Sequence, residues 1–179
     1  KQKMKTVGTS VPEPIFQFLL RVFLKAEKNV YVFGDNKCGQ LGLGDDVARR
    51  YPTINESLSK QEIVSISAGK KHSMILLNKG KVLAWGSNKY GQLGINQKEE
   101  FTSKPTEIKL LFQPTKISCG YKNSVFLSKE KEAYICGLSF ENKSKSCEIK
   151  KIIEVQKIKN IYCSNFYVLQ DVENVIYVR

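Results

Sequence analysis

The chain has 179 residues and a mass of 20.3 kDa, and 41% of its residues are hydrophobic and 10% aromatic. This composition excludes a disordered chain and provides enough apolar residues for a hydrophobic core. The formal net charge of +12 predicts attraction to nucleic acid, acidic protein segments or anionic lipid. Because the lysines are scattered rather than gathered in one block, a basic surface that is merely solvated stays open as an alternative.

The first region, residues 1–28, contains the most apolar stretch of the chain, Ile15–Leu24. Gln17 and Arg21 interrupt this stretch, and its length of about ten residues is half of the roughly twenty that a membrane-spanning helix needs. It also lacks the small-residue cleavage site of a signal peptide. We therefore expect neither a membrane span nor a secretory signal. The stretch forms either a short buried helix or a strand, because its apolar positions cover all sides.

An internal repeat follows this region. The segment "VYVFGDNKCGQLGLGD" at 30–45 recurs as "VLAWGSNKYGQLGINQ" at 82–97. The glycines that end the two strand-like runs, Gly34 and Gly86, lie 52 positions apart. A period of this length is typical of a propeller or a repeat array.

A second motif repeats with nearly the same period. The segment "SISAGKKHSMILL" at 65–77 recurs as "KISCGYKNSVFLS" at 116–128, which places Gly69 and Gly120 51 positions apart. Two independent markers therefore share one period.

Later copies of the repeat are weaker. The segment "AYICG" ends at Gly137, 51 positions after Gly86, but "LSFENKSKS" at 138–146 replaces the G-Q-L-G signature. A further copy begins with "IYCSNFYVLQ" at 161–170 and "VIYVR" at 175–179.

Each repeat has the pattern of short antiparallel strands. The runs "IVSIS" and "KVLAW" are rich in β-branched and aromatic residues, and "NKGK" at 78–81 is a hairpin signal. A repeat of about fifty residues with three or four such strands predicts a propeller blade. We expect a partial β-propeller over 29–179, with repeats at about 29–80, 81–131 and 132–174 and the start of another at 175–179.

The glycine-rich segment "CGQLGLGDD" at 38–46 is compatible with two interpretations. A phosphate-binding loop requires G-x-x-x-x-G-K-[ST], and a dinucleotide fold requires G-x-G-x-x-G before a helix; neither spacing is present. A structural corner fits better, because glycine permits positive φ and close backbone approach, while the Gln40 amide can bond loop backbone groups. The recurrence of the segment favours this interpretation for Gly39, Gly42 and Gly44 and for their counterparts Gly91 and Gly94.

No set of residues typical of a hydrolase or transferase can be assembled. His72 is the single histidine, so a site with two imidazoles is excluded. The five cysteines contain no C-x-x-C pair, which excludes the usual zinc spacing and indicates reduced thiols in a cytosolic or nuclear protein. We expect no metal and no cofactor.

The motifs G-D-N-K-C-G-Q-L-G and S-A-G-K-K-H-S, each with its second copy, resemble the repeats of the regulator of chromosome condensation family. Kelch repeats have a similar period but carry a double glycine that is absent from this sequence. The resemblance covers about 29–179 and implies a seven-bladed, all-β propeller. It also implies that His72 bonds the neighbouring blade's backbone. The resemblance further assigns a structural role to the glycines of the repeats, which are Gly34, Gly39, Gly42, Gly44, Gly69, Gly86, Gly91, Gly94 and Gly120.

Seven blades of this size need about 350 residues, so the chain provides only three to four blades. An open half-ring leaves its end sheets uncovered. We therefore expect the chain to be the N-terminal half of a longer protein or to be completed by another chain. A strand within Ile15–Leu24 would close the ring by pairing with the last blade.

The resemblance implies a guanine-nucleotide exchange factor for a Ran-type small GTPase, associated with chromatin in the nucleus. It also implies that the basic tail, with Lys1, Lys3 and Lys5, contacts DNA in a salt-dependent way; a frayed terminus is the alternative. A different class stays open, namely a non-catalytic scaffold that binds a protein partner in a larger assembly, in the nucleus or the cytoplasm.

The segment after Gly137 resembles the start of the family's third-blade insertion, a wedge that acts in nucleotide exchange. The resemblance implies that Phe140, Glu141, Asn142 and Lys143 pry at the phosphate loops of a bound GTPase; a degenerate loop is the alternative.

One departure from the family pattern opposes exchange activity. Exchange factors of the family tend to carry an acidic residue at the position of Tyr121, and a GTPase that presents basic residues would lack that carboxylate here.

Overall fold

The computed structural model describes residues 23–24, 29–95, 100–138, 145–153, 155 and 157–178. This part of the chain is all-β, with no α-helix and one short 3-10 turn at Asn78–Gly80. None of its helical segments is long and apolar enough to cross a bilayer.

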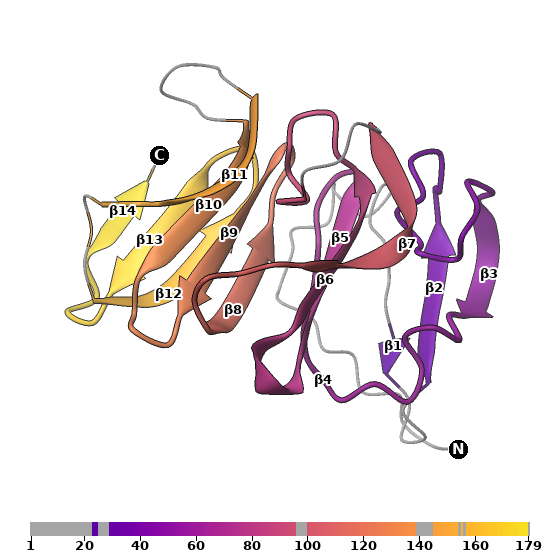
Figure 1. Cartoon of the computed structure of the whole chain (residues 1–179), viewed down its shortest axis with the longest axis horizontal. Coiled ribbons are helices and arrows are strands. Elements are labelled where there is room, and N and C mark those ends of the chain that lie inside the picture. The colour runs from indigo at the N-terminus through magenta and orange to yellow at the C-terminus, as the bar shows by residue number, and fades with distance from the viewer. Residues whose placement is uncertain are drawn as a thin grey trace.

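Four antiparallel sheets stand side by side along the molecule, from indigo to yellow in Figure 1. Two sheets have four strands and two have three. The first sheet contains β1 (Phe23–Leu24), β2 (Val30–Gly34) and β3 (Arg49–Ile54); the second β4 (Ile63–Ala68), β5 (His72–Leu77), β6 (Val82–Ser87) and β7 (Phe101–Ile108); the third β8 (Pro114–Cys119), β9 (Asn123–Ser128), β10 (Ala133–Leu138) and β11 (Lys145–Lys151); and the fourth β12 (Ile158–Cys163), β13 (Tyr167–Asp171) and β14 (Ile176–Val178). The chain is therefore a partial propeller, as the sequence predicted.

The sheets are offset from the sequence repeats by half a unit. The repeat at 29–80 contains β2 to β5, so it provides two strands to the first sheet and two to the second. The repeat at 81–131 divides between the second and third sheets in the same way. Each repeat thus links two neighbouring blades through the backbone. The period alone does not determine this offset, because the repeat length is the same whichever residue is taken as the first of a repeat.

The two described residues of the apolar N-terminal stretch form a strand, not a helix. Phe23 pairs with Tyr31 and Leu24 with Val30, so β1 belongs to the first sheet. Because β1 lies at the edge of the described sheet, its expected pairing with the last blade of a complete ring stays a prediction. Pairing with β2 closes a loop of only a few residues, which costs far less chain entropy than pairing across the molecule.

The hydrophobic core lies between the sheets. Val32 and Trp85 belong to a cluster between the first and second sheets, and Met74 and Phe126 belong to one between the second and third. Leu127 and Leu169 belong to a third cluster between the third and fourth sheets. The strands β4, β8 and β12 also contact one another in this order. Each sheet thus buries one face against each neighbour it has, as expected when blades stack.

Candidate functional site

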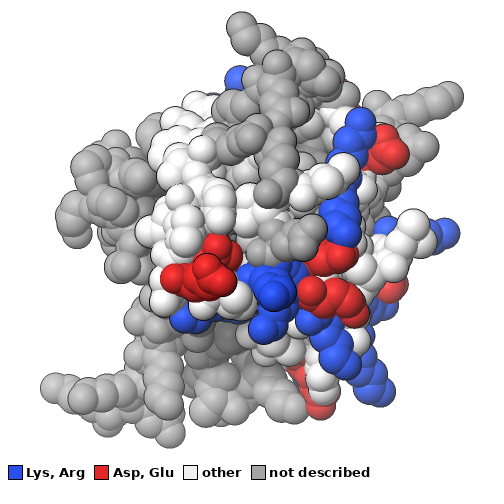
Figure 2. Space-filling model, turned by 90° about the vertical axis from the view of Figure 1, so that its left-hand side faces the viewer, with Lys and Arg blue, Asp and Glu red and all other residues white. Residues whose placement is uncertain are grey.

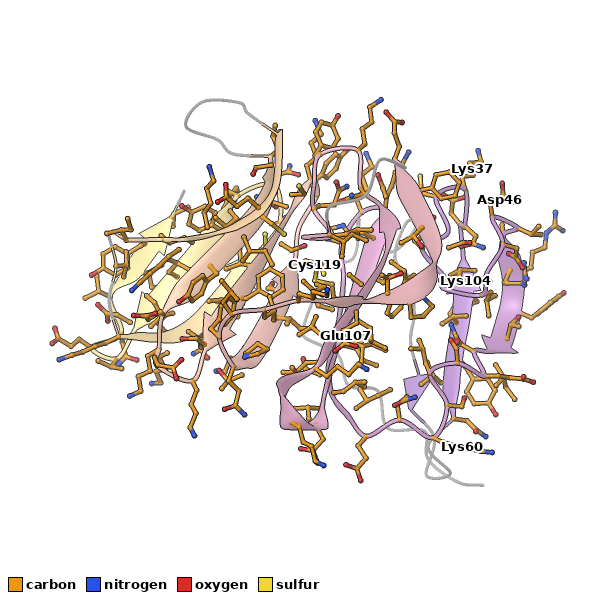
Figure 3. The ribbon with its side chains drawn as sticks, viewed as in Figure 1. Lys37, Asp46, Lys60, Lys104, Glu107 and Cys119 are labelled. Carbon is orange, nitrogen blue, oxygen red and sulfur yellow. The ribbon has the colours of Figure 1, made fainter. Side chains whose placement is uncertain are left out.

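The connections that follow the even-numbered strands lie at one end of the sheets, called the loop face below. Lys37 and Asp46 lie at this end in Figure 3, and Lys60 lies at the opposite end. The described residues of the loop face are 35–48, 69–71, 88–95, 100, 120–122 and 164–166.

The G-Q-L-G segments on this face form corners that their own side chains close. Gln40 Oε1 accepts a hydrogen bond from the Cys38 amide at 2.9 Å, and Asn36 Oδ1 accepts one from the Leu41 amide at 2.8 Å. The amides of Gly39, Gly42 and Gly44 donate to carbonyl groups of the protein. The backbone N–H groups that would bind a phosphate therefore already donate hydrogen bonds within the protein.

Each corner packs against the next sheet. Gly39 has φ +71°, and a Cβ on it would lie 2.5 Å from Ser103 Cα; Gly91 has φ +80°, and a Cβ on it would lie 2.4 Å from the Ser146 backbone. Such approaches exclude any side chain. The leucine of the second corner, Leu93, is completely buried.

A shared carbonyl fastens each corner to the next sheet. The Gln40 carbonyl accepts hydrogen bonds from Ser73 Oγ at 2.9 Å and from Trp85 Nε1 at 2.8 Å. In the second corner, the equivalent Gln92 carbonyl accepts from Ser124 Oγ at 2.8 Å and from Cys136 Sγ at 3.4 Å. This arrangement, called the blade joint below, occurs twice in the described chain.

His72 lies at the second blade joint and is completely buried. Its Nε2 lies 2.7 Å from Ser124 Oγ, and because that hydroxyl donates to the Gln92 carbonyl, Nε2 carries the proton and donates. The partner is thus a side chain of the next blade rather than its backbone. Burial lowers the pKa of His72 to about 3, so the imidazole stays neutral and has no contact with solvent that a general base would need.

Three cysteines are unreactive thiols, of which Cys119 and Cys136 are buried and Cys163 is partly buried. Burial raises the pKa of Cys119 to about 12 and also raises the pKa values of Cys136 and Cys163. A thiol is a nucleophile or metal ligand only when it is deprotonated. Within the described ranges, no three His, Cys, Asp or Glu side chains are grouped so that they could bind a metal ion.

The chemically distinctive part of the loop face surrounds Tyr121, whose residue surface is 39% exposed. The Lys70 ammonium lies 3.9 Å from the centroid of the Tyr121 ring, and the Lys122 ammonium lies 4.7 Å from the centroid of the Tyr90 ring. Lys122 is also 6.0 Å from the Tyr121 ring. We call these four residues the Tyr121 cluster. They come from the connections after β4, β6 and β8, so the cluster spans the second and third sheets.

Backbone hydrogen bonds hold the turns of the cluster side by side. The Lys70 amide donates to the Gly120 carbonyl at 3.1 Å, and the Tyr121 amide donates to the Ser164 carbonyl at 2.8 Å. Three successive blades are thereby linked at the loop face. The side chains of the cluster project from a backbone that is already fixed.

The residues predicted for nucleotide exchange and for DNA contact lie outside the described residues. They are Phe140, Glu141, Asn142, Lys143 and the tail lysines Lys1, Lys3 and Lys5.

The acidic residues of the first corner divide into two kinds. An ion pair with Arg49 holds the pKa of Asp45 below its usual value, whereas Asp46 is exposed.

The repeat assignment follows from comparison with known families. Residues 28–76 and 79–127 each match the model of the regulator of chromosome condensation (RCC1) repeat, and 63–92 match a second model of the same repeat. The chain belongs to the RCC1 repeat family. The matched RCC1 repeats contain both G-Q-L-G corners and the whole Tyr121 cluster.

Several curated proteins resemble this chain. It is 34% identical to human Protein RCC2 over 117 residues, which are 65% of this chain and 22% of RCC2. It is 35% identical to the human probable E3 ubiquitin-protein ligase HERC4 over 117 residues, which are 64% of this chain and 11% of that protein. The chain thus spans only a small part of these relatives.

Solved structures share the fold. Human WBSCR16 superposes with a TM-score of 0.79 at 18% identity, over 89% of this chain and 44% of that one. Prp20p from Saccharomyces cerevisiae superposes with a TM-score of 0.74 at 22% identity, over 89% of this chain and 42% of that one. At these identities the likeness is one of fold.

Proposed function

We propose that the chain is a protein-interaction module of the RCC1 type, and that its loop face binds a partner protein around the Tyr121 cluster. The observation that carries this proposal is a partly exposed tyrosine with two ammonium groups near its ring, placed across the boundary of two blades. Tyrosine is enriched at protein interfaces, where its ring is apolar and its hydroxyl can form hydrogen bonds.

The relatives support a binding role without choosing the partner. One of them is named as a probable ubiquitin-protein ligase, whereas the name of RCC2 states no activity, and a shared fold does not determine the function. A structure of yeast Prp20 contains bound Kap60, and another is described together with the binding of Prp20p to Gsp1p and histones. Protein partners are thus reported for a propeller of this fold.

Photochemical crosslinking tests the proposed face directly. Tyr121 is replaced by p-benzoyl-L-phenylalanine in the chain expressed in its native cell type, and Leu111, which is fully exposed at the opposite end of the sheets, is replaced in a matched control. We expect a discrete crosslinked protein from position 121 and not from position 111. Identical products from both positions, or none from position 121, would contradict the proposal.

A second candidate function is nucleotide exchange on a Ran-type small GTPase at chromatin in the nucleus. The likeness to Prp20p, with its described binding of Gsp1p, favours this candidate. Exchange would require the loop face to bind the nucleotide-free GTPase more tightly than the nucleotide-bound form. Phe140, Glu141, Asn142 and Lys143 would form the wedge, and Tyr121 would occupy the place of the acidic residue.

Release of a fluorescent GDP analogue separates this candidate from binding alone. The GTPase is mixed with the chain and with a variant in which Phe140 to Lys143 are replaced by Gly and Ser. Acceleration by the parent chain that the variant loses would support exchange through the wedge. Binding without acceleration would leave the scaffold role, and acceleration that survives the replacement would rule out the wedge.

The DNA contact of the tail has its own test. If Lys1, Lys3 and Lys5 bind phosphates, DNA affinity falls steeply with salt and decreases when the three lysines are neutralised. An unchanged affinity would remove this role.

We also propose that further blades, from the same chain or another, cover the outer side of the fourth sheet. Tyr162 is 52% exposed there, Ile176 62% and Val178 61%. Figure 2 faces this end and shows charged side chains gathered beside an area of other residues. Apolar side chains grouped on one sheet are typical of a covered surface.

A further inference from the structure

We propose that the Tyr121 cluster recognises an acidic segment of the partner protein, with a carboxylate bound between Lys70 and Lys122. This inference rests on the proposed function and adds the chemistry of the partner. Its starting point is an excess of positive charge. Two ammonium groups lie within 6.0 Å of one ring centroid, and neither belongs to an ion pair in the described part of the chain.

Neighbouring charges strengthen the attraction for an anion. Lys71 and Lys89 lie in the same connections as the cluster and are exposed, and Glu100 is the one acidic residue described in the connections after β4, β6, β8 and β12. The tyrosine rings offset part of the repulsion between the ammonium groups, because the ring faces carry partial negative charge. A carboxylate between Lys70 and Lys122 would neutralise the excess charge more completely, with two charge-assisted hydrogen bonds.

The cluster favours a short acidic peptide over nucleic acid. Bases bind proteins by stacking on aromatic faces, but the Lys70 ammonium already covers one face of Tyr121 and Lys122 lies against Tyr90. Asp35 and Asp46 are exposed on the same loop face, beside the first sheet. They would repel a long polyanion that continued across the face, whereas a short segment can end before reaching them.

The geometry also limits the cost of binding. The Lys70 and Tyr121 amides hold their turns to the next blades, and both ammonium groups are already held near tyrosine rings. A partner would therefore lose little affinity to the ordering of this surface.

Fluorescence anisotropy with a labelled hexaglutamate peptide tests the inference on the whole chain. We expect K70Q/K122Q to weaken peptide binding by about tenfold. The control variant K109Q/K129Q removes the same charge from exposed lysines at the opposite end, and we expect a change of less than about twofold. Equal losses in the two variants, or no loss in K70Q/K122Q, would overturn the proposal.

Two further arms identify the source of the anion and the role of the ring. A short DNA duplex that competes with the peptide at the cluster, with a loss in K70Q/K122Q at least as large, would overturn the choice of an acidic peptide. Tyr121→Phe keeps the ring and should bind the peptide within about twofold, whereas Tyr121→Leu should weaken binding severalfold. Equal binding by these two variants would contradict a role for the ring.

The peptide-binding experiment and the crosslinking experiment can fail independently of each other. A partner crosslinked at position 121 together with no peptide binding would overturn the acidic chemistry and leave the interaction face in place. Peptide binding at the cluster without a crosslinked partner would contradict the proposed function instead.

Discussion

His72 Nε2 donates a hydrogen bond to Ser124 Oγ at 2.7 Å, across the boundary between the second and third sheets. These residues are 52 positions apart, about one repeat. The Ser124 hydroxyl continues the connection to the Gln92 carbonyl. A buried polar chain therefore fastens the corner of one blade to the second strand of the next, and its His72 must stay neutral.

Acid should weaken this joint. The pKa of His72 is lowered by burial from 6.5 to about 3, so between these values the unfolded chain binds a proton that the folded chain does not. The free energy of unfolding should fall by up to about 1.4 kcal/mol for each pH unit below about pH 6. Urea midpoints measured from pH 7 to pH 4 would show this slope.

The control is His72→Asn, because Asn123 occupies the equivalent position in the next sheet. This variant should be less stable at pH 7, but it should lack the histidine contribution to the slope. Identical slopes for both proteins would contradict a neutral, buried His72.

Glycine substitutions should separate close packing from backbone strain. Gly91→Ala adds a Cβ 2.4 Å from the Ser146 backbone at φ +80°, so we expect a loss of about 3 kcal/mol. Gly44→Ala has φ +90° but meets only the flexible Lys104 side chain at 3.5 Å, so we expect about 1 kcal/mol. Lys104 is labelled in Figure 3. Equal losses in urea unfolding would contradict the close contact at the second corner.

The shared carbonyl of the first blade joint predicts a non-additive effect. Trp85→Phe and Ser73→Ala each remove one donor to the Gln40 carbonyl. Ser73→Ala should cost about 1 to 2 kcal/mol, and Trp85→Phe should cost more, because it also leaves a cavity in the core. The double variant should lose more than the sum, because it leaves a buried carbonyl without either donor. Circular dichroism is the suitable probe, since Trp85 is the only tryptophan. Strict additivity would show that the two bonds do not act together.

Much of the fold was predictable because stacked blades place residues one period apart beside each other. The spacing alone predicted blades, both between Gly34 and Gly86 and between Gly69 and Gly120. The recurrence of G-Q-L-G likewise favoured a structural corner, and the corner amides are bonded within the protein. The offset between repeats and sheets was not predictable, since it depends on long-range strand pairing that the period does not contain.

The Tyr121 cluster was only partly predictable. The sequence marked Tyr121 as a missing acidic residue, but it gave no reason to single out Lys70 or Lys122. A signal was present, because Lys70 and Tyr121 each follow the glycine of the repeated motif and are 51 positions apart. Their contact depends on how the side chains turn at the blade boundary, which spacing alone does not determine.

The exposed apolar residues of the fourth sheet predict the behaviour of the isolated chain. If further blades cover Ile176 and Val178 in the complete assembly, the 179-residue chain alone should self-associate through that sheet. Light scattering should then give a mass above 20.3 kDa. A stable, soluble monomer would contradict the requirement for further blades.

The most direct test of the central claim is the response of single lysines to an acidic peptide. In the free protein, the ε-methylene protons of Lys70 should be shielded by the Tyr121 ring, because the ammonium group lies 3.9 Å from the ring centroid. On titration with hexaglutamate, we predict that the NMR signals of Lys70 and Lys122 move most, while those of Lys109 and Lys129 stay nearly unchanged. Equal movement of all four lysines, or no movement of Lys70 and Lys122, would contradict a binding site at the Tyr121 cluster.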